Sequence, residues 1–364
     1  MEKRYDVVVI GGGQAGLAMG WHLARQGRDF LVLDASPRIG DAWRTRWDSL
    51  TLFTPARYSG LPGMAFPAEP DHLPRKDEVA DYLEHYAHRF GLPVRSGEPV
   101  LALRRAPDGA GFVVETARAR YEADQVVVAT GPFRKPLVPS FAADLAPEVV
   151  QLHGSEYRSA AQLPPGGDVL VVGGGNSGVQ IAAEVAAARR TWLSVGEKLV
   201  RIPERFLGRS VFWWLEKAGV MNVTVGSRLG RRASEREMLI GQSPELIARD
   251  LGVRLAGRAE RASGGRIHTA DGKTVEAAAV VWATGFRADF GFVELPVLDG
   301  RGRPVHVRGV TAEAGLYFLG LPWQHTRGSA LIGWVGRDAA YLADRIAERA
   351  RKHPSPSPVP TVIA

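Results

Sequence analysis

The stretch Val7-Val8-Val9-Ile10-Gly11-Gly12-Gly13-Gln14-Ala15-Gly16 decides the fold of this 364-residue chain. Its apolar half predicts a parallel strand buried on both faces, and the residues after the glycines, Leu17 to Gln26, predict a helix. Phe30-Leu31-Val32-Leu33 predicts the next strand, which ends at Asp34 and Ala35. The order of strand, glycine turn, helix and strand with a terminal acid is typical of a dinucleotide-binding unit.

Each glycine of this turn has a physical role. Gly11 permits the tight turn, Gly13 lets the backbone approach a pyrophosphate, and Gly16 allows the helix to pack closely on the strand. The free N–H groups at the start of the helix, around Gln14 and Ala15, are donors for the phosphates. The sequence therefore predicts a dinucleotide site here.

A second copy of the unit follows. Val169-Leu170-Val171-Val172 runs into Gly173-Gly174-Gly175-Asn176-Ser177-Gly178, a helix is expected over Val179 to Ala188, and a strand over Thr191 to Val195. The glycines at 173, 175 and 178 each lie 162 residues after those at 11, 13 and 16. Two such units in one chain predict two dinucleotide-binding domains.

Asp34, the acid that ends the first unit, has no acidic counterpart 162 residues further along the chain. Asp34 can accept hydrogen bonds from ribose hydroxyls and repels a 2′-phosphate, so the first site suits FAD or NAD. The offset places Gly196 in the second unit, followed by Glu197 and Lys198, with Arg201 nearby. The second site therefore suits NADPH, whereas a Glu197 that binds the ribose would select NADH.

Two further strands end in the same three residues. Val126-Val127-Val128-Ala129-Thr130-Gly131 and Val280-Val281-Trp282-Ala283-Thr284-Gly285 place small residues where the chain can pass close to a cofactor or cross between domains. Either copy alone reads as a strand ending in an ordinary turn; the duplication favours a functional hinge. Between the first unit and Ala129, residues 94–128 predict a small antiparallel meander.

Composition excludes several classes of protein. The chain has no cysteine, so it holds no disulfide, thiolate metal site or dithiol redox centre. The net charge is +7, but the basic residues are spread along the chain, which argues against nucleic-acid binding. We expect no metal, because the histidines lack ligand spacing, and no membrane contact. The start of the chain lacks a signal-like segment, which indicates a cytoplasmic protein.

These features together resemble the flavin-containing monooxygenases, in particular their short bacterial branch. The resemblance rests on both glycine turns, Gly40-Asp41-Ala42-Trp43, the segment from Trp47 to Pro62, both Ala-Thr-Gly ends, and Gly315 to Leu342. It implies an α/β fold with two Rossmann-like domains, in which an NAD(P)H domain (150–284) is inserted into a discontinuous FAD domain (1–139 and 285–352). Residues 353–364 are expected to form a flexible tail.

The same resemblance implies the chemistry. NAD(P)H would reduce FAD, O2 would add at the flavin C4a to give a (hydro)peroxyflavin, and oxygen would pass to a small sulfide, amine or ketone. Trp43, Trp47 and Phe53 are expected near the isoalloxazine, with Gln324 and Ser329 closing over it. Arg44, and Arg46 beside it, are candidates for the pyrophosphate.

The chain departs from the family's pattern at two places. His153 and Tyr157 keep only half of the family's identifying motif. The asparagine that the eukaryotic branch places beside the flavin is missing, and Phe53 lies near its expected position. Phe53, Thr54 and Asn176 are therefore the candidate catalytic residues. Weak stabilisation of the oxygenated flavin, with release of hydrogen peroxide, is one expected consequence.

Two other functions remain open from the sequence. One is an FAD-dependent NAD(P)H reductase that passes electrons to a protein partner, and the other is a redox sensor without turnover. The expected partners of the monooxygenase are a small-molecule substrate and O2, with a homodimer as the default assembly. The aromatic run Phe212-Trp213-Trp214-Leu215 is expected to pack as buried core, with cover for the nicotinamide or contact with a membrane surface as the alternatives.

Overall fold

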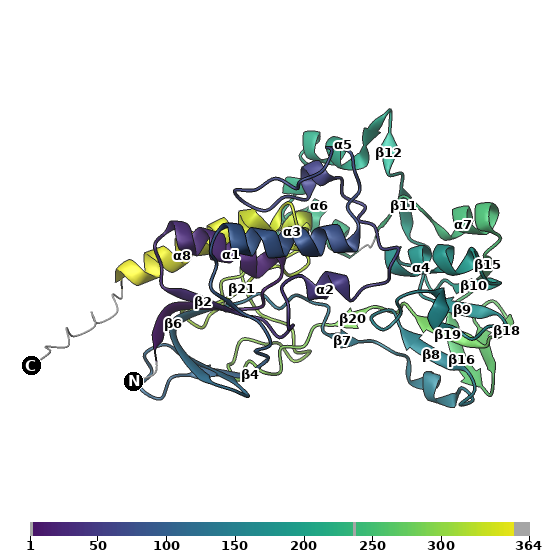
Figure 1. Cartoon of the computed structure of the whole chain (residues 1–364), viewed down its shortest axis with the longest axis horizontal. Coiled ribbons are helices and arrows are strands. Elements are labelled where there is room, and N and C mark those ends of the chain that lie inside the picture. The colour runs from purple at the N-terminus through teal and green to yellow at the C-terminus, as the bar shows by residue number, and fades with distance from the viewer. Residues whose placement is uncertain (1–2, 236–237, 353–364) are drawn as a thin grey trace, which may run out of the picture.

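Two largely parallel sheets organise the computed structural model, which describes residues 3–235 and 238–352 (Figure 1). The expected tail, 353–364, lies outside the described residues. The first sheet has the order β3-β2-β1-β6-β5-β4, and β21 pairs with the last part of β6. Its strands are β1 (Arg4–Ile10), β2 (Phe30–Leu33), β3 (Val94–Arg95), β4 (Val100–Arg105), β5 (Phe112–Thr116), β6 (Arg120–Val128) and β21 (Leu316–Phe318).

The first sheet confirms the strands expected around the first glycine turn. β1 lies parallel to both β2 and β6, and Val7, Val8 and Val9 are fully buried because both faces are covered. Helices α1 (Gln14–Arg25), α3 (Lys76–Arg89) and α8 (Val335–Lys352) lie together along one face (Figure 1). The antiparallel meander is confirmed for β4, β5 and the first half of β6, whereas β3, at the start of the expected stretch, pairs parallel with β2.

The second sheet is wholly parallel, in the order β15-β10-β9-β19-β8. Apolar residues of a three-stranded antiparallel sheet pack with strands β9 and β19 into one hydrophobic cluster. Helices α4 (Asn176–Ala186) and α7 (Pro244–Leu251) lie on the other side (Figure 1). The strands are β8 (Val150–His153), β9 (Val169–Val172), β10 (Thr191–Ser194), β15 (Arg254–Ala256) and β19 (Ala279–Trp282), and the small sheet is β16 (Ala259–Ser263), β17 (Arg266–Thr269) and β18 (Thr274–Glu276).

The chain leaves the first sheet after β6, builds the second, and returns to place β21 beside β6. The two crossing segments run side by side: β7 (Lys135–Pro136) pairs antiparallel with β20 (Phe286–Arg287). The fold is therefore two Rossmann-like units, one discontinuous and the other inserted, as expected. Close to each crossing lies one of the Ala-Thr-Gly ends.

The long segment between β10 and α7 forms several short elements outside the second sheet. It holds the parallel pair β11 (Val200–Ile202) and β14 (Met238–Ile240), the hairpin β12 (Arg205–Phe206) and β13 (Arg209–Ser210), and helices α5 (Val211–Lys217) and α6 (Arg228–Ser234). The same segment holds the 3-10 turn η4 (Val220–Asn222). Short elements elsewhere are α2 (Asp41–Arg44) and the 3-10 turns η1 (Ala56–Tyr58), η2 (Ser140–Asp144), η3 (Ala160–Gln162) and η5 (Arg327–Ala330).

Both helices after the glycine turns begin earlier than expected. α1 starts at Gln14 rather than Leu17, and α4 starts at Asn176 rather than Val179. The first hydrogen bonds explain this, because Leu17 N–H donates to Gly13 and Val179 N–H donates to Gly175, each over 3.0 Å. The last two glycines of each motif thus lie at the helix start. In residues 3–235 and 238–352, no helix has the length and apolar character needed to cross a bilayer.

Candidate active site

The first glycine turn closes against the end of β6. Gly11 has φ +112°, and a Cβ on it would lie 2.6 Å from the Ala129 carbonyl oxygen. A Cβ on Gly16 would lie 1.8 Å from the Gly11 oxygen, whereas a Cβ on Gly13 would meet nothing within 4 Å. The turn is therefore closed by contact at its two ends and open at Gly13, where a ligand can approach the backbone.

Asp34 holds the next loop at the end of β2. Its carboxylate accepts hydrogen bonds from Gly12 N–H and, over 2.7 Å, from Ser36 N–H. A cavity of about 260 Å³ lies beside it. The structure brings together in its lining the predicted residues Gly11, Gly13, Gln14, Ala15, Asp34, Ala35, Thr130 and Gly131.

The second turn repeats this geometry in detail. Gly173 has φ +124°, and a Cβ on it would lie 2.3 Å from the Ala283 carbonyl oxygen. A Cβ on Gly178 would lie 1.8 Å from the Gly173 oxygen, and one on Gly175 would meet nothing within 4 Å. The alanine of each Ala-Thr-Gly motif thus packs its carbonyl on the first glycine of its own turn, which gives both motifs a shared structural role.

The structure corrects the residue matched to Asp34. Gly11 N–H donates to the Leu33 carbonyl and Gly173 N–H donates to the Ser194 carbonyl, so the residue after Ser194, Val195, is the counterpart of Asp34. A Cβ on Gly174 accordingly meets the Val195 side chain, as one on Gly12 meets Asp34. The expected match to Gly196 was wrong by one residue, because helix α4 has 11 residues whereas helix α1 has 12.

A cation that the sequence did not single out lies at this point of the second unit. The Arg258 guanidinium donates to the Gly196 carbonyl over 3.3 Å. Arg258 follows β15, far along the chain, so no local motif could have found it. Lys198, the expected cation, lines neither the cavity at the first turn nor the larger cavity at the second turn that is described next. Lys198 instead faces Glu245, whose pKa is lowered first by a hydrogen bond from its own backbone N–H, then by Ser243, and less by the charges of Lys198 and Arg201.

A larger cavity, of about 520 Å³, lies at the second turn. Its lining includes the predicted Trp47, Phe53, Gly175, Asn176, Ser177, Gly178 and Gly285. It shares three residues with the first cavity, Arg46, Phe133 and Ala330, so the two spaces adjoin. Both ends of the Asn176 amide are engaged, donating to the Met238 carbonyl over 3.1 Å and accepting from Ile240 N–H over 3.0 Å.

Two arginines in this larger cavity lack a carboxylate partner among the described residues. Arg46 donates to the Ala42 carbonyl over 3.1 Å and lies over the Phe286 ring, 5.2 Å from its centroid. Burial lowers the pKa of both Arg46 and Arg327, with Arg158 adding to the effect at Arg46. Cations held in this way are suited to bind anionic ligand groups.

The other predicted residues lie outside the linings of the two cavities. Arg44 forms ion pairs with Asp41 and with two acids of α3, at 3.0 Å from Glu84, so its guanidinium points away from the first turn. Arg46, and not Arg44, lines the cavity at that turn. Trp43 packs against the core. The remaining polar residues are Thr54, buried beside Ser59; Thr284, bonded to the Leu137 carbonyl; Gln324, which accepts from Leu321 N–H; and Ser329, which accepts from His325 and Thr326 N–H.

His153 joins the second sheet to the crossing segment. Its Nε2 lies 3.0 Å from the Gly285 carbonyl, and its Nδ1 accepts from Ser155 N–H over 3.1 Å. Burial lowers the pKa of His153, which favours the neutral ring that this pattern requires. Its role here is to hold the hinge, and Tyr157 is bound separately to Glu184. Among the described residues, no three potential ligands of the His, Asp or Glu type gather as a metal site.

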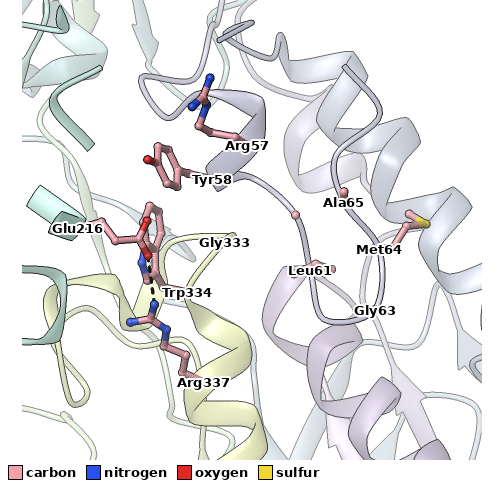
Figure 2. Close-up of a pocket in the computed structure, with 11 residues that line it drawn as sticks. Arg57, Tyr58, Leu61, Gly63, Met64, Ala65, Glu216, Gly333, Trp334 and Arg337 are labelled. Carbon is pink, nitrogen blue, oxygen red and sulfur yellow. Dashed lines mark hydrogen bonds and ion pairs between the residues drawn. The ribbon is translucent and has the colours of Figure 1, made fainter. Parts of the chain in front are cut away.

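A wall of aromatic rings bounds the larger cavity. Phe53 stacks on Phe212 at 6.0 Å between centroids, and Phe212 in turn contacts Tyr58 and Trp334. Behind this wall lies a separate cavity of about 390 Å³ (Figure 2). Figure 2 shows that it lies between the segment around Tyr58, helix α5 and the start of α8, with an ion pair between Glu216 and Arg337 at 3.3 Å.

Comparison with known proteins agrees with this architecture. The family described as pyridine nucleotide-disulphide oxidoreductase matches residues 8–199. An oxidoreductase named CzcO-like from Geobacillus kaustophilus is 47% identical, over 95% of this chain and 99% of its own. The "Probable indole-3-pyruvate monooxygenase YUCCA3" of Arabidopsis thaliana is 27% identical over 94% of this chain and 86% of its own. The solved structure of a flavin-containing monooxygenase from Stenotrophomonas maltophilia superposes with a TM-score of 0.79 at 30% identity, covering 96% of this chain and all of that one.

The two relatives and the solved structure match nearly the whole chain, and the family match includes both glycine turns. Because the chain has no cysteine, it lacks the dithiol for which the wider family is named. The chain belongs to the pyridine nucleotide-disulphide oxidoreductase family and, within it, to the flavin-containing monooxygenases, which are flavin-dependent oxidoreductases.

Proposed function

We propose that this protein is an NADPH-consuming FAD monooxygenase that oxygenates small soft nucleophiles, such as sulfides and amines, or ketones. The overall reaction is NADPH + H⁺ + O2 + substrate to NADP⁺ + H2O + oxygenated substrate. The observation that carries the proposal is the pair of glycine turns with the same geometry, which open on two adjoining cavities that share Arg46, Phe133 and Ala330.

The first turn fits the diphosphate and ribose of FAD. Gly13 leaves open space at the start of α1, and Asp34 lies at the end of the neighbouring strand. The Thr130 hydroxyl, in the lining of the same cavity, is buried and has no hydrogen-bond partner within the described part of the chain. An unpaired buried hydroxyl is costly, so a ligand that bonds to it stabilises the site. In this proposal residues 1–139 and 285–352 hold FAD.

The second turn fits NADPH. Gly175 leaves open space at the start of α4, and Val195 replaces the acid that would repel a 2′-phosphate. Arg258, beside Gly196, supplies a positive charge at the place where that phosphate would lie. In this proposal residues 150–284 hold NADPH, with NADH as the weaker alternative.

Bound FAD supplies the carrier that takes electrons from the nicotinamide and delivers them to O2. The chain's own residues position and enclose the reactants. The stacked Phe53 and Phe212 exclude water from the larger cavity, and Asn176 holds β14 against the start of α4. The Trp47 indole N–H, buried without a described partner, is a free donor in the same cavity. Arg46 and Arg327 place positive charge there.

The substrate class follows from this cavity and from the relatives. About 520 Å³, which the reactive ends of two cofactors must also enter, leaves room for a small substrate against aromatic walls. The similarity to a protein named as an indole-3-pyruvate monooxygenase keeps oxo compounds within the proposed class. Methyl phenyl sulfide and a small aryl ketone are suitable first probes. Formation of the sulfoxide or ester with consumption of NADPH and O2 tests the proposal, and NADPH oxidation with neither product for any probe counts against it.

Arg258→Ala is expected to raise the KM for NADPH about tenfold and to leave the KM for NADH nearly unchanged. The expected loss is one charge-assisted contact to the 2′-phosphate, which is absent from NADH. Steady-state oxidation of the two coenzymes measures both values. Arg261→Ala, an exposed arginine on the neighbouring strand β16, is the matched control. Equal effects of Arg258→Ala on both coenzymes would remove Arg258 from phosphate binding.

Turnover is expected to release a substantial share of the reduced oxygen as hydrogen peroxide. The physical reason is that an apolar ring, Phe53, lines the cavity near the place where the eukaryotic branch has a hydrogen-bonding asparagine, and Asn176 is already engaged. Measuring NADPH, O2, peroxide and product in one reaction gives the share. A ratio of product to NADPH close to one would show that the site is well coupled and that this expectation is wrong.

A further inference from the structure

The hairpin of β12 and β13 projects from the upper edge of the molecule beside α5 (Figure 1). Phe206 pairs with Arg209, so the loop consists of Leu207 and Gly208. Both loop residues have positive φ, +47° and +74°. Two-residue loops of this kind favour Asn-Gly, because a leucine is disfavoured in the left-handed region. The sequence therefore places an apolar side chain at the tip against the local backbone preference.

The apolar side chains around this tip are exposed and ordered by mutual contact. Leu207 is 74% exposed, Phe206 53% and Trp214 36%. The Trp214 ring lies edge-on to Phe206, and its indole N–H donates to the Phe206 carbonyl over 2.9 Å. Trp213 packs edge-on against Trp214. Burial was expected for the whole aromatic run, and this is correct for Phe212 but wrong for Trp214.

Basic side chains surround this apolar cluster. The Arg209 guanidinium lies 4.6 Å above the Trp213 ring, and the Lys217 ammonium lies 6.0 Å from the same ring. Arg205 donates to the Gly208 carbonyl, and its guanidinium lies 3.9 Å from the Asp71 carboxylate. Glu216, the acid within α5, is paired with Arg337. Glu204 directly precedes the hairpin, and Asp71 is also paired with Arg57, so four basic side chains face two acids at the base. The tip is therefore apolar at its end, with a net positive charge around its base.

We propose that this hairpin docks the protein on an anionic lipid surface. Phe206, Leu207 and Trp214 enter the boundary between headgroups and acyl chains, while Arg205, Arg209 and Lys217 bind the lipid phosphates. An apolar end with a basic collar matches the chemistry of such a surface, where apolar burial and attraction to anionic lipids add. The contact is peripheral, and it replaces the expectation of no membrane contact. It is independent of the proposed oxygenation.

Docking would also orient the active site. The hairpin leads directly into α5, whose Phe212 is fully buried and lines the larger cavity. Glu216, one turn further along the same helix, lines the separate cavity of Figure 2. A membrane contact at the hairpin thus brings both cavities near the lipid surface, where apolar substrates concentrate.

The test is sedimentation of the full-length, FAD-loaded protein with vesicles. We expect it to bind vesicles made of equal parts phosphatidylglycerol and phosphatidylcholine, to bind weakly to phosphatidylcholine alone, and to be released by salt. Leu207→Asn is expected to weaken binding about tenfold, because it removes the apolar tip while giving the loop its favoured Asn-Gly sequence. Arg209→Gln is expected to weaken it about fivefold.

Leu101→Asn is the matched control, because Leu101 is 58% exposed on β4, at the opposite side of the molecule in Figure 1. It should bind vesicles like the wild type. NADPH oxidation without vesicles should be the same for the wild type and all three variants. Absence of vesicle binding by the wild type, or equal losses in Leu207→Asn and Leu101→Asn, would overturn the proposal. Conversion of a wild-type dimer to monomer by Leu207→Asn, with no vesicle binding, would assign the surface to a second copy of the chain instead.

Discussion

Replacing Gly13 with valine is expected to give a folded, colourless protein that has lost FAD. A Cβ at this position would meet no protein atom within 4 Å apart from its chain neighbours, and φ is −79°, so the backbone conformation is one that valine adopts without strain. Valine would instead fill the space through which the pyrophosphate reaches the N–H groups of α1. Loss of two charge-assisted hydrogen bonds alone weakens binding by about 100-fold or more.

The measurement is the flavin absorbance of the purified variant, together with its thermal unfolding. The stability should fall by only about 1 kcal/mol relative to wild-type protein stripped of FAD, because valine is a poorer N-cap residue than glycine. A variant that retains its yellow colour would contradict the placement of FAD at the first turn.

Replacing Gly175 with valine is expected to give the reciprocal result. The protein should bind FAD normally, while its anaerobic reduction by NADPH slows by about 100-fold at coenzyme concentrations that saturate the wild type. The position is equally open, because a Cβ on Gly175 would meet no protein atom within 4 Å and φ is −78°. Reduction by dithionite should be unaffected, which serves as the control for an intact flavin. Rapid reduction of the Gly175→Val protein by NADPH would show that the second turn does not bind the coenzyme.

The pair of variants tests the assignment of the two turns as well as each site. The substitutions are chemically identical and are made at positions related by the internal repeat. If both variants lost FAD, or if their phenotypes were exchanged, the assignment of the first turn to FAD and the second to NADPH would be wrong.

The parts of the site that could be predicted from sequence are those set by short stretches of chain. Gly11, Gly13 and Gly16 act within one turn, and their spacing alone encodes the closed and open positions that the structure shows. The same holds for the second turn. The carbonyl contacts of Ala129 and Ala283 explain why the Ala-Thr-Gly ends are duplicated along with the turns.

The parts that sequence missed depend on contacts between distant segments. Whether Arg44 or Arg46 faces the cavity is decided by Asp81 and Glu84 on α3, which bind Arg44 from 37 and 40 residues away. Arg258 reaches Gly196 from 62 residues away. The match to Asp34 failed for a different reason, because a fixed offset cannot register a helix that is one residue shorter in the second unit.

The measurement that tests the central claim most directly is anaerobic reduction of the FAD-loaded protein with NADPH, followed by rapid mixing with oxygenated buffer. The account predicts fast bleaching of the flavin by NADPH, and then a transient near-ultraviolet band, distinct from those of oxidised and reduced flavin, that decays faster when a sulfide or ketone substrate is present. Fast bleaching followed by slow reoxidation without that band would contradict the monooxygenase and point to a reductase that needs a protein acceptor.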